Sequence, residues 1–384
     1  MTNTAISSAA ASVSNYYFSD KLKEINELQK NGNKIINLGI GNPDLAPPEE
    51  VTKILSNLSL EKNVHAYQNY NGIFELRKAF ADWYMKYFKV KLNPENEILP
   101  LQGSKAGIMH ISMAFLNKND KVLIPDPAYP AYKSATEIAG ALPVIYDLKK
   151  SKNRLPDLDE LNKKDLSKVK IMWINYPNMP TGKNASRVFF SELINFASEN
   201  KILVCNDNPY SFILNENCLS LLSAENAFNN AVELNSLSKS HNIAGWRIGA
   251  LFGNSKYINA VKKIQTNITS GMFLPLQKAA IKALYIDRQW YKNLNKIYTE
   301  RRKTVWKILD KLNCKYDKHT SGMFVWAEIP DKFKTGYDFS DFLLYKHSIF
   351  VTPGGIFGSN GNKYIRISLC NDINTLNKIL KKLQ

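Results

Sequence analysis

The chain has 384 residues, of which 44% are hydrophobic and 22% are charged, a balance typical of a globular protein with a substantial core. Its net charge is +17, but Lys and Arg are scattered along the chain without the basic stripe or reading helix of a nucleic-acid-binding domain. No apolar run approaches the ~20 residues that cross a bilayer, and the start has no secretion-signal pattern. We therefore expect neither nucleic acid nor a membrane as a partner.

The cysteines and histidines exclude two further classes of protein. The five histidines show no metal-ligand spacing, so we predict no metal site. The four cysteines lie far apart and form no CxxC pair, which favours reduced, buried thiols in a cytoplasmic protein. They are Cys205, Cys218, Cys314 and Cys370.

Short apolar segments alternate with helical patterns from about residue 48 to 285. This alternation predicts an α/β fold, with a mostly parallel sheet sandwiched by helices. We expect an N-terminal arm and part of a small domain over 1–46, a large domain over 47–286, and a small C-terminal α/β domain over 287–384. Strands are expected at 122–125, 143–146, 171–175, 202–206, 231–234, 248–252, 323–329, 349–351 and 364–369, and helices at 19–30, 187–199, 288–312 and 371–383.

The stretch from 235 to 249 carries the strongest chemical signal. Lys239 lies among hydroxyl residues, and Arg247 follows eight residues later. A lysine whose pKa is depressed can form a Schiff base, while Ser236, Ser238 and Arg247 offer donors for a phosphate. The pattern favours a lysine that holds pyridoxal phosphate through an imine; the alternative is an ordinary basic loop after a strand.

Several other segments follow predicted strands, where ligands bind in an open parallel sheet. Gly103, Ser104 and Lys105 form a turn opening a helix, which suits a phosphate, or else a plain helix cap at Ser104. Tyr129, in a proline-stiffened loop, can stack on a pyridine ring, or else pack as an ordinary loop aromatic.

Two charged residues complete the group of candidates. Asp207 can face a ring nitrogen and keep it protonated, with Tyr210 donating to the ring phenolate, although the segment is also good turn material. Arg366 stands inside an alternating strand and needs an anionic partner if it is buried. A substrate carboxylate is one such partner, and the alternative is an arginine that extends from a strand edge.

These segments occur in one order over almost the whole chain and resemble the class I and II aminotransferases, pyridoxal-phosphate enzymes of fold type I. The resemblance implies that Lys239 is the imine lysine and proton shuttle, Asp207 the partner of the pyridinium, Tyr210 the phenolate donor and Tyr129 the stacked ring. It also implies a phosphate cup made by the backbone of Ser104 and Lys105, next to Gly103, together with Ser236, Ser238 and Arg247.

The resemblance implies substrate contacts and a homodimer as well. Arg366 corresponds to the clamp on the substrate α-carboxylate, and Gly39 to the glycine whose loop closes on it. Tyr67 matches a tyrosine that family members send across a dimer interface to the partner's phosphate.

One position departs from the family's Asn-Pro-Thr-Gly pattern, in which the Asn donates to the phenolate oxygen and steadies the carboxylate-binding Arg. Met179 stands at that place, and the preceding Asn178 could substitute only if the loop shifts. With Met179 in the slot, Tyr210 is the main phenolate donor, and we predict that the imine keeps its proton to higher pH.

The function implied by the resemblance is amino transfer between an L-amino acid and a 2-oxo acid. The segments 39–45, 103–105, 175–178 and 269–273 are similar to those of LL-diaminopimelate aminotransferases. Aspartate, alanine, aromatic and methionine aminotransferases remain alternatives, as does a C–S lyase that uses the same lysine. A regulator that kept the fold is disfavoured, because Lys239 is present and no DNA-binding segment is visible.

Overall fold

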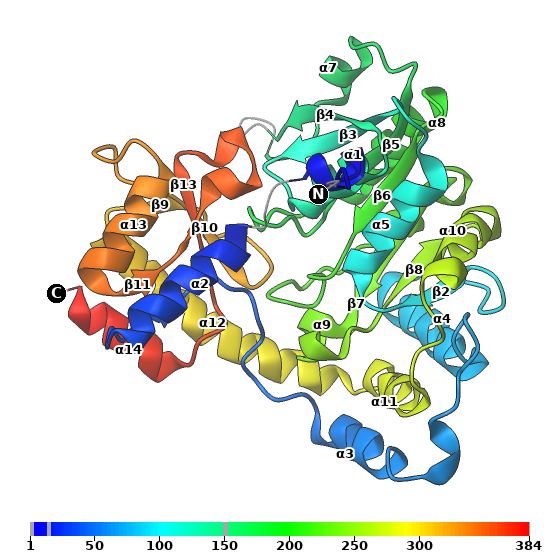
Figure 1. The fold of residues 1–384 in the computed structure, drawn as a ribbon, viewed down its shortest axis with the longest axis horizontal. Coiled ribbons are helices and arrows are strands. Elements are labelled where there is room, and N and C mark those ends of the chain that lie inside the picture. Colours follow the sequence, from blue (N-terminus) through cyan, green and yellow to red (C-terminus); the bar gives the residue numbers. More distant parts are fainter. Residues whose placement is uncertain (1–3, 14–16, 149–152, 384) are drawn as a thin grey trace.

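The computed structural model describes residues 4–13, 17–148 and 153–383. Residues 1–3 and 14–16 of the predicted N-terminal arm lie outside the described residues. At the centre is a seven-stranded sheet, which confirms the predicted α/β class (Figure 1). In spatial order the strands are β2 (Ile98–Leu101), β8 (Gly249–Gly253), β7 (Ala231–Ser236), β6 (Leu203–Asp207), β5 (Val169–Ile174), β3 (Lys121–Asp126) and β4 (Leu142–Asp147).

Only β8 runs against its neighbours in this sheet, since it pairs antiparallel with both β2 and β7. The other pairs, from β7 to β4, are parallel, as the alternation of strands and helices predicted. The edge strand β2 was missed by the sequence analysis, because its Ile-Leu-Pro-Leu run is short and contains a proline.

Helices cover both faces of the sheet, and the strands are apolar on both sides for that reason. On β5, Ile171 and Trp173 pack in one cluster, while Met172 and Ile174 belong to another on the opposite face. The first face holds α5 (Ser104–Phe115), α6 (Ala131–Ile138) and α10 (Ser255–Ile268). The second holds α3 (Glu49–Leu58), α4 (Phe74–Phe88), α8 (Arg187–Glu199) and α11 (Leu274–Leu284).

A smaller α/β unit is built from both ends of the chain. Its antiparallel sheet has the order β12 (Thr352–Pro353), β13 (Tyr364–Ser368), β10 (Phe324–Glu328) and β9 (Lys315–Tyr316). Next to it β1 (Ile36–Asn37) pairs in parallel with β11 (Ile349–Phe350), which joins the N-terminal segment to the C-terminal one. The helices of this unit are α2 (Tyr17–Lys30), α12 (Arg288–Lys311), α13 (Gly336–His347) and α14 (Ile373–Lys382).

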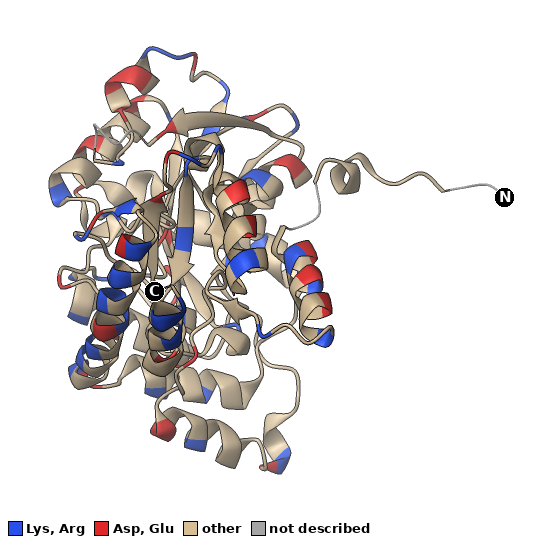
Figure 2. Ribbon diagram, turned by 90° about the vertical axis from the view of Figure 1, so that its left-hand side faces the viewer, with Lys and Arg blue, Asp and Glu red and all other residues tan. Residues whose placement is uncertain are grey.

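Short helical turns complete the described structure. The segment that holds α1 (Ser8–Ala11) stands out from the body (Figure 2). Within the described ranges, no helix combines the length and the apolar character needed to span a membrane. The remaining turns are α7 (Leu158–Asn162), α9 (Leu237–Ser240), η1 (Lys62–Val64), η3 (Leu221–Ser223), η4 (Ala227–Asn229), η5 (Ala244–Trp246), η6 (Gly354–Phe357) and η7 (Ser359–Gly361).

Candidate active site

A cavity of about 460 Å³ lies beyond the carboxyl ends of the parallel strands, with walls from both the large sheet and the smaller unit. Asp207 ends β6, Ser236 ends β7, and Arg366 comes from β13. Because parallel strands end at one edge of the sheet, residues far apart in sequence meet there. The predicted residues that line the cavity are Ser104, Lys105, Tyr129, Met179, Asp207, Tyr210, Ser236, Ser238, Lys239, Arg247 and Arg366.

The remaining candidates lie elsewhere. Gly103 does not line the cavity, but a Cβ on it would overlap the guanidinium of Arg247. Gly39 contacts Arg366, because its carbonyl oxygen accepts a hydrogen bond from the guanidinium. Asn178 does not reach the cavity, because its Oδ1 accepts a 2.6 Å hydrogen bond from the Thr181 hydroxyl. Tyr67 is 92% exposed on the surface.

Lys239 is held on the short helix α9, which begins where the Ser236 hydroxyl accepts from the Ser238 amide. Its amine is buried and donates a 2.7 Å hydrogen bond to the carbonyl oxygen of Gly41. Burial lowers the pKa of Lys239 to about 8, and the nearby Arg247 contributes in the same direction. A sizeable fraction of the amine is therefore neutral, as a nucleophile requires.

Helix α9 is fastened to the start of α12. The Trp290 indole donates to the carbonyl of Ser240 at 3.0 Å, and the Tyr291 hydroxyl lies 3.0 Å from His241 Nε2. Burial lowers the pKa of His241 to about 3, so this imidazole is neutral. His241 is thus a packing residue that fixes the backbone beside Lys239.

Asp207 is buried at the end of β6. Its Oδ2 accepts a 3.0 Å hydrogen bond from the Tyr132 hydroxyl, while Oδ1 is buried with no partner among the described residues. Burial raises the pKa of Asp207 to about 7, and the buried Glu233 adds to the rise. A cationic donor placed at Oδ1 would restore the charged carboxylate.

The opposite end of the cavity has the features of an anion site. Gly103 is the N-cap of α5 with φ +86°, and the guanidinium of Arg247 lies against it, so the start of this helix is beside Arg247. The hydroxyls of Ser236 and Ser238 lie 2.8 Å apart at the start of α9. A helix start, two hydroxyls and a guanidinium are typical of phosphate binding.

Arg366 is buried on β13, which decides between the two alternatives that the sequence left open, a buried arginine and one extending from a strand edge. Its Nη2 donates to the Gly39 carbonyl at 2.8 Å, and Nη1 lies 3.2 Å from Met179 Sδ. Its guanidinium carbon is 3.9 Å from the ring centre of Phe324 and 4.8 Å from that of Phe357. A guanidinium with so little water around it binds a carboxylate strongly.

Met179, and not Asn178, therefore lies beside Arg366, at the place where the Asn-Pro-Thr-Gly pattern has its Asn. Asn175, a residue the sequence analysis did not single out, also lines the cavity just after β5. Its Oδ1 accepts from the Met179 amide at 2.7 Å, and its Nδ2 donates to the Asp207 carbonyl. The rule of strand ends that found Asp207 could have found Asn175.

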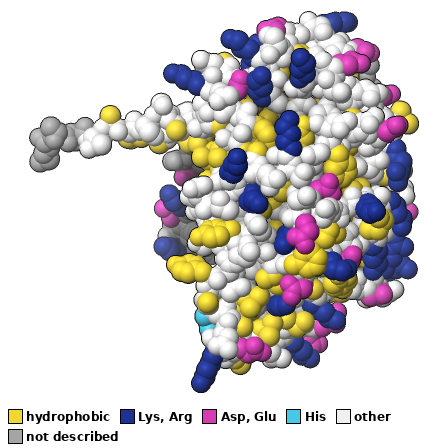
Figure 3. All heavy atoms as spheres, turned by 90° about the vertical axis from the view of Figure 1, so that its right-hand side faces the viewer, with side chains coloured by type: hydrophobic (Ala, Val, Ile, Leu, Met, Phe, Trp, Pro, Cys, Tyr) yellow, Lys and Arg dark blue, Asp and Glu magenta, His cyan; other side chains and the backbone are white. Residues whose placement is uncertain are grey.

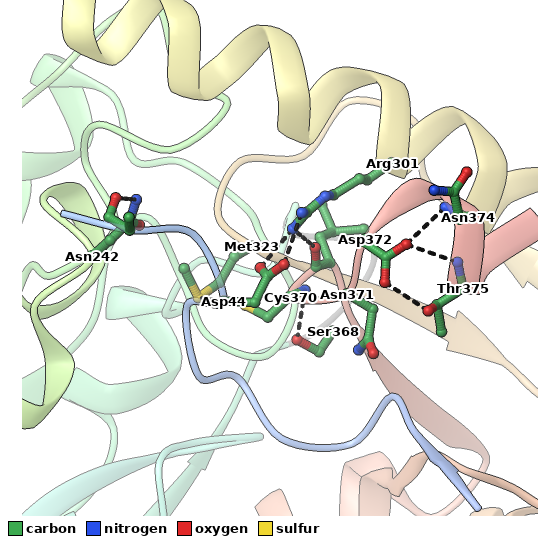
Figure 4. Close-up of polar contacts among 12 residues, drawn as sticks. Asp44, Asn242, Arg301, Met323, Ser368, Cys370, Asn371, Asp372, Asn374 and Thr375 are labelled. Atoms are coloured by element: carbon green, nitrogen blue, oxygen red, sulfur yellow. Dashed lines mark hydrogen bonds and ion pairs between the residues drawn. The ribbon is translucent and has the colours of Figure 1, made fainter. Parts of the chain in front are cut away.

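The loop that carries Gly41 is anchored from outside the cavity. Arg301, buried on α12, donates to both carboxylate oxygens of Asp44, at 2.6 and 2.8 Å, and to the Leu369 carbonyl (Figure 4). Leu369 directly follows β13, so Arg301 supports both this loop and the end of β13, and close by Asp372 caps α14. The ion pair between Arg301 and Asp44 therefore helps to fix the loop whose Gly41 carbonyl accepts from Lys239.

A family model of the class I and II aminotransferases matches residues 33–383, and the chain belongs to this family. The protein is an aminotransferase, an enzyme that uses amino acids and 2-oxo acids, and its family generally uses pyridoxal phosphate.

The relatives agree on the class of enzyme and differ in name. The chain is 40% identical to an LL-diaminopimelate aminotransferase of Natranaerobius thermophilus, with 96% of both chains covered. It is 38% identical to the transaminase BacF of Bacillus subtilis, with 96% of this chain and 92% of that one covered. The substrate-bound structure of BacF superimposes with a TM-score of 0.95, at 36% identity over 99% of this chain and 97% of that one.

Proposed function

We propose that the protein transfers an amino group from an L-amino acid to a 2-oxo acid with pyridoxal phosphate held by Lys239. The observation that carries this proposal is that Asp207 Oδ1 is buried without a partner among the described residues. It lies in the same cavity as Lys239, whose pKa is lowered by burial. Such an oxygen fits a protonated ring nitrogen, and the anion site beside Gly103 and Arg247 fits the phosphate. The residues present therefore suit this cofactor.

When bound, pyridoxal phosphate supplies an aldehyde carbon and a ring that accepts electrons. Lys239 would hold the cofactor through its amine, and the same amine would take or give a proton at the substrate α-carbon. Asp207 holds the proton on the ring nitrogen, and Tyr132 holds Asp207 in place. Tyr210 would donate to the ring phenolate, and Tyr129 would cover the ring face.

The substrate end is formed by Arg366, which binds the α-carboxylate. The Gly39 carbonyl and Met179 sulfur hold the guanidinium in position. Because Phe324 and Phe357 exclude water from this cation, the ion pair with the substrate fixes where the α-carbon lies relative to Lys239.

We also propose a homodimer in which Tyr67 reaches the partner's phosphate site. Exposed apolar side chains gather on two segments that touch: the Phe273 ring stacks on His65 at 5.8 Å, and Gly271 fits against the backbone of Gln68. Hydrophobic patches among the charges are visible in Figure 3. Several exposed apolar side chains on two segments in contact favour an interface. These side chains are Leu60, Tyr67, Tyr70, Phe74, Ile268 and Phe273.

The test combines chemical trapping with a donor panel. Borohydride reduction of the cofactor-loaded protein should fix the cofactor on Lys239, as peptide mapping would show. LL-diaminopimelate, aspartate, alanine, methionine and phenylalanine are then offered with 2-oxoglutarate or pyruvate as acceptor. Pyruvate release from cystathionine without any amino transfer would instead indicate a C–S lyase, and no adduct at Lys239 would overturn the proposal.

A further inference from the structure

The cavity's wall around Arg366 is aromatic. Besides Phe324 and Phe357, the ring of Phe18 lies 5.7 Å from the guanidinium carbon. Phe18 comes from the first turn of α2, more than 300 residues from Arg366 in sequence, and it also lines the cavity. Ile40, from the loop opposite, adds a further apolar side chain to this wall.

The charged side chains that line the cavity are mostly those expected to bind the cofactor or the substrate α-carboxylate. In the described part of the chain Asp207 is the sole carboxylate of the lining, and it lies at the ring-nitrogen position. Of the cations, Arg247 lies beside the start of α5, where Lys105 is the second helical residue, while Lys239 would hold the cofactor and Arg366 would bind the α-carboxylate. A distal ammonium or carboxylate on the substrate would therefore meet no dedicated counter-charge from the cavity lining of this chain, which is costly where the surrounding rings exclude water.

We propose that the site selects donors with an apolar, above all aromatic, side chain, and that Phe18 is the residue that sets this preference. This inference rests on the proposed function, because it takes Arg366 as the carboxylate clamp. A substrate carboxylate on Arg366 places the side chain beside the same rings that surround the guanidinium. An aromatic side chain gains stacking and apolar burial there, whereas a second charge loses its hydration.

Single-turnover reactions of the cofactor-loaded enzyme with donor alone test the preference without an acceptor. The amine form is followed by its absorbance for L-phenylalanine, L-alanine, L-aspartate and LL-diaminopimelate. We expect L-phenylalanine to be at least about tenfold more efficient than either charged donor. A faster reaction with LL-diaminopimelate or aspartate would overturn the inference while leaving the proposed function intact. If no donor reacts and no adduct forms at Lys239, the proposed function itself fails.

Variants at Phe18 separate a specificity role from a structural one. Phe18→Ala should raise the apparent dissociation constant for L-phenylalanine about tenfold and change that for L-alanine less than about twofold. Phe18→Leu, which keeps apolar bulk, should show a smaller loss and covers the case in which Phe18→Ala does not fold. Binding of the unreactive analogues 3-phenylpropionate and glutarate, followed through the cofactor spectrum, gives a readout independent of turnover.

The matched control is Tyr17→Phe, which removes a hydroxyl next to Phe18 on α2 but outside the cavity lining. It should leave both donors and both analogues unchanged. Equal losses for phenylalanine and alanine in the Phe18 variants, or tighter binding of glutarate than of 3-phenylpropionate, would contradict the assignment.

Discussion

The amine of Lys239 donates a 2.7 Å hydrogen bond to the backbone carbonyl of Gly41, which lies almost 200 residues earlier in the chain. The lysine lies on α9, directly after β7 of the large sheet, and the glycine lies in the loop after β1 of the smaller unit. The contact keeps the buried amine solvated by the protein itself. It also means that Lys239 leaves Gly41 when it attaches to a cofactor.

The first prediction concerns the acidity of this amine. In the cofactor-free protein, attachment of pyridoxal phosphate should accelerate with pH up to about 8 and then level off, because only the neutral amine attacks an aldehyde. A lysine at the ordinary value of 10.5 would give a rate that still rises at pH 9. Stopped-flow absorbance measures the rate, with N-acetyl-lysine amide as the reference for the aldehyde's own titration.

Replacement of the lysine separates chemistry from folding. Lys239→Ala should abolish turnover and borohydride trapping while the cofactor-free protein stays folded and at least as stable as the wild type at neutral pH, because the burial that depresses the pKa of this amine costs stability and the alanine removes that cost. Loss of the folded state in this variant would contradict the assignment of Lys239 to the reaction alone.

The unpartnered oxygen of Asp207 predicts that replacing this residue raises the stability of the cofactor-free protein but lowers the activity of the enzyme. Its folded-state pKa is raised to about 7 from 3.8, so the folded protein binds a proton that the unfolded chain releases, and stability falls as pH rises between these values. The cofactor-free Asp207→Asn variant should therefore be more stable than the wild type at pH 8, by roughly 3 kcal/mol, and equal to it near pH 4.

The same substitution should weaken cofactor binding and reduce turnover on the order of 100-fold or more, because the ring nitrogen loses its counter-charge. Denaturant unfolding at the two pH values and cofactor titration measure the two effects. A variant that is less stable than the wild type at pH 8 would show that Asp207 has a cationic partner in the cofactor-free protein.

Met179 allows a spectral prediction. Its sulfur, a weak acceptor, lies beside Arg366 where the family places an amide that also donates to the phenolate oxygen. Met179→Asn should supply that donor, stabilise the deprotonated linkage and lower the pKa of the imine. A pH titration of the visible spectrum measures it, and an unmoved or raised value would count against the role given to this position.

The ion pair between Asp44 and Arg301 predicts that even a conservative substitution of Asp44 lowers the stability of the protein. Asp44→Asn leaves the buried guanidinium of Arg301 without its carboxylate and should lower the free energy of unfolding by roughly 2 kcal/mol, less than for a fully buried pair because Asp44 is partly exposed. Since the loop also carries Gly39 and Gly41, the KM for the donor should rise. Glu50→Gln, which breaks the exposed Lys282 pair, is the control and should change neither quantity.

Most of the candidate site residues predicted from the sequence line one cavity, and there is a physical reason for this. Lys239, Asp207 and Arg366 each follow or occupy a strand, and strand periodicity is local information that a single chain displays. The reversed direction of β8 and the choice between Met179 and Asn178 depend on long-range packing. The same holds for Phe18, whose helix gives no sign that it meets a strand near the other end of the chain.

The shared active site can be tested with hybrid dimers. Tyr67 is 92% exposed within its own chain and does not line its own chain's cavity, so its proposed contact with the phosphate requires a second copy. Tyr67→Phe should weaken cofactor binding, and Lys239→Ala should be inactive. A hybrid of the two, purified through different affinity tags, combines the intact lysine of one chain with the intact tyrosine of the other at a single site. It should show about half the wild-type activity and cofactor content.

Two outcomes would contradict the shared site. If Tyr67 served its own subunit or only the surface, the lysine-bearing site of the hybrid would behave like that of the Tyr67→Phe homodimer. Sedimentation of the wild type as a monomer would exclude the shared site altogether.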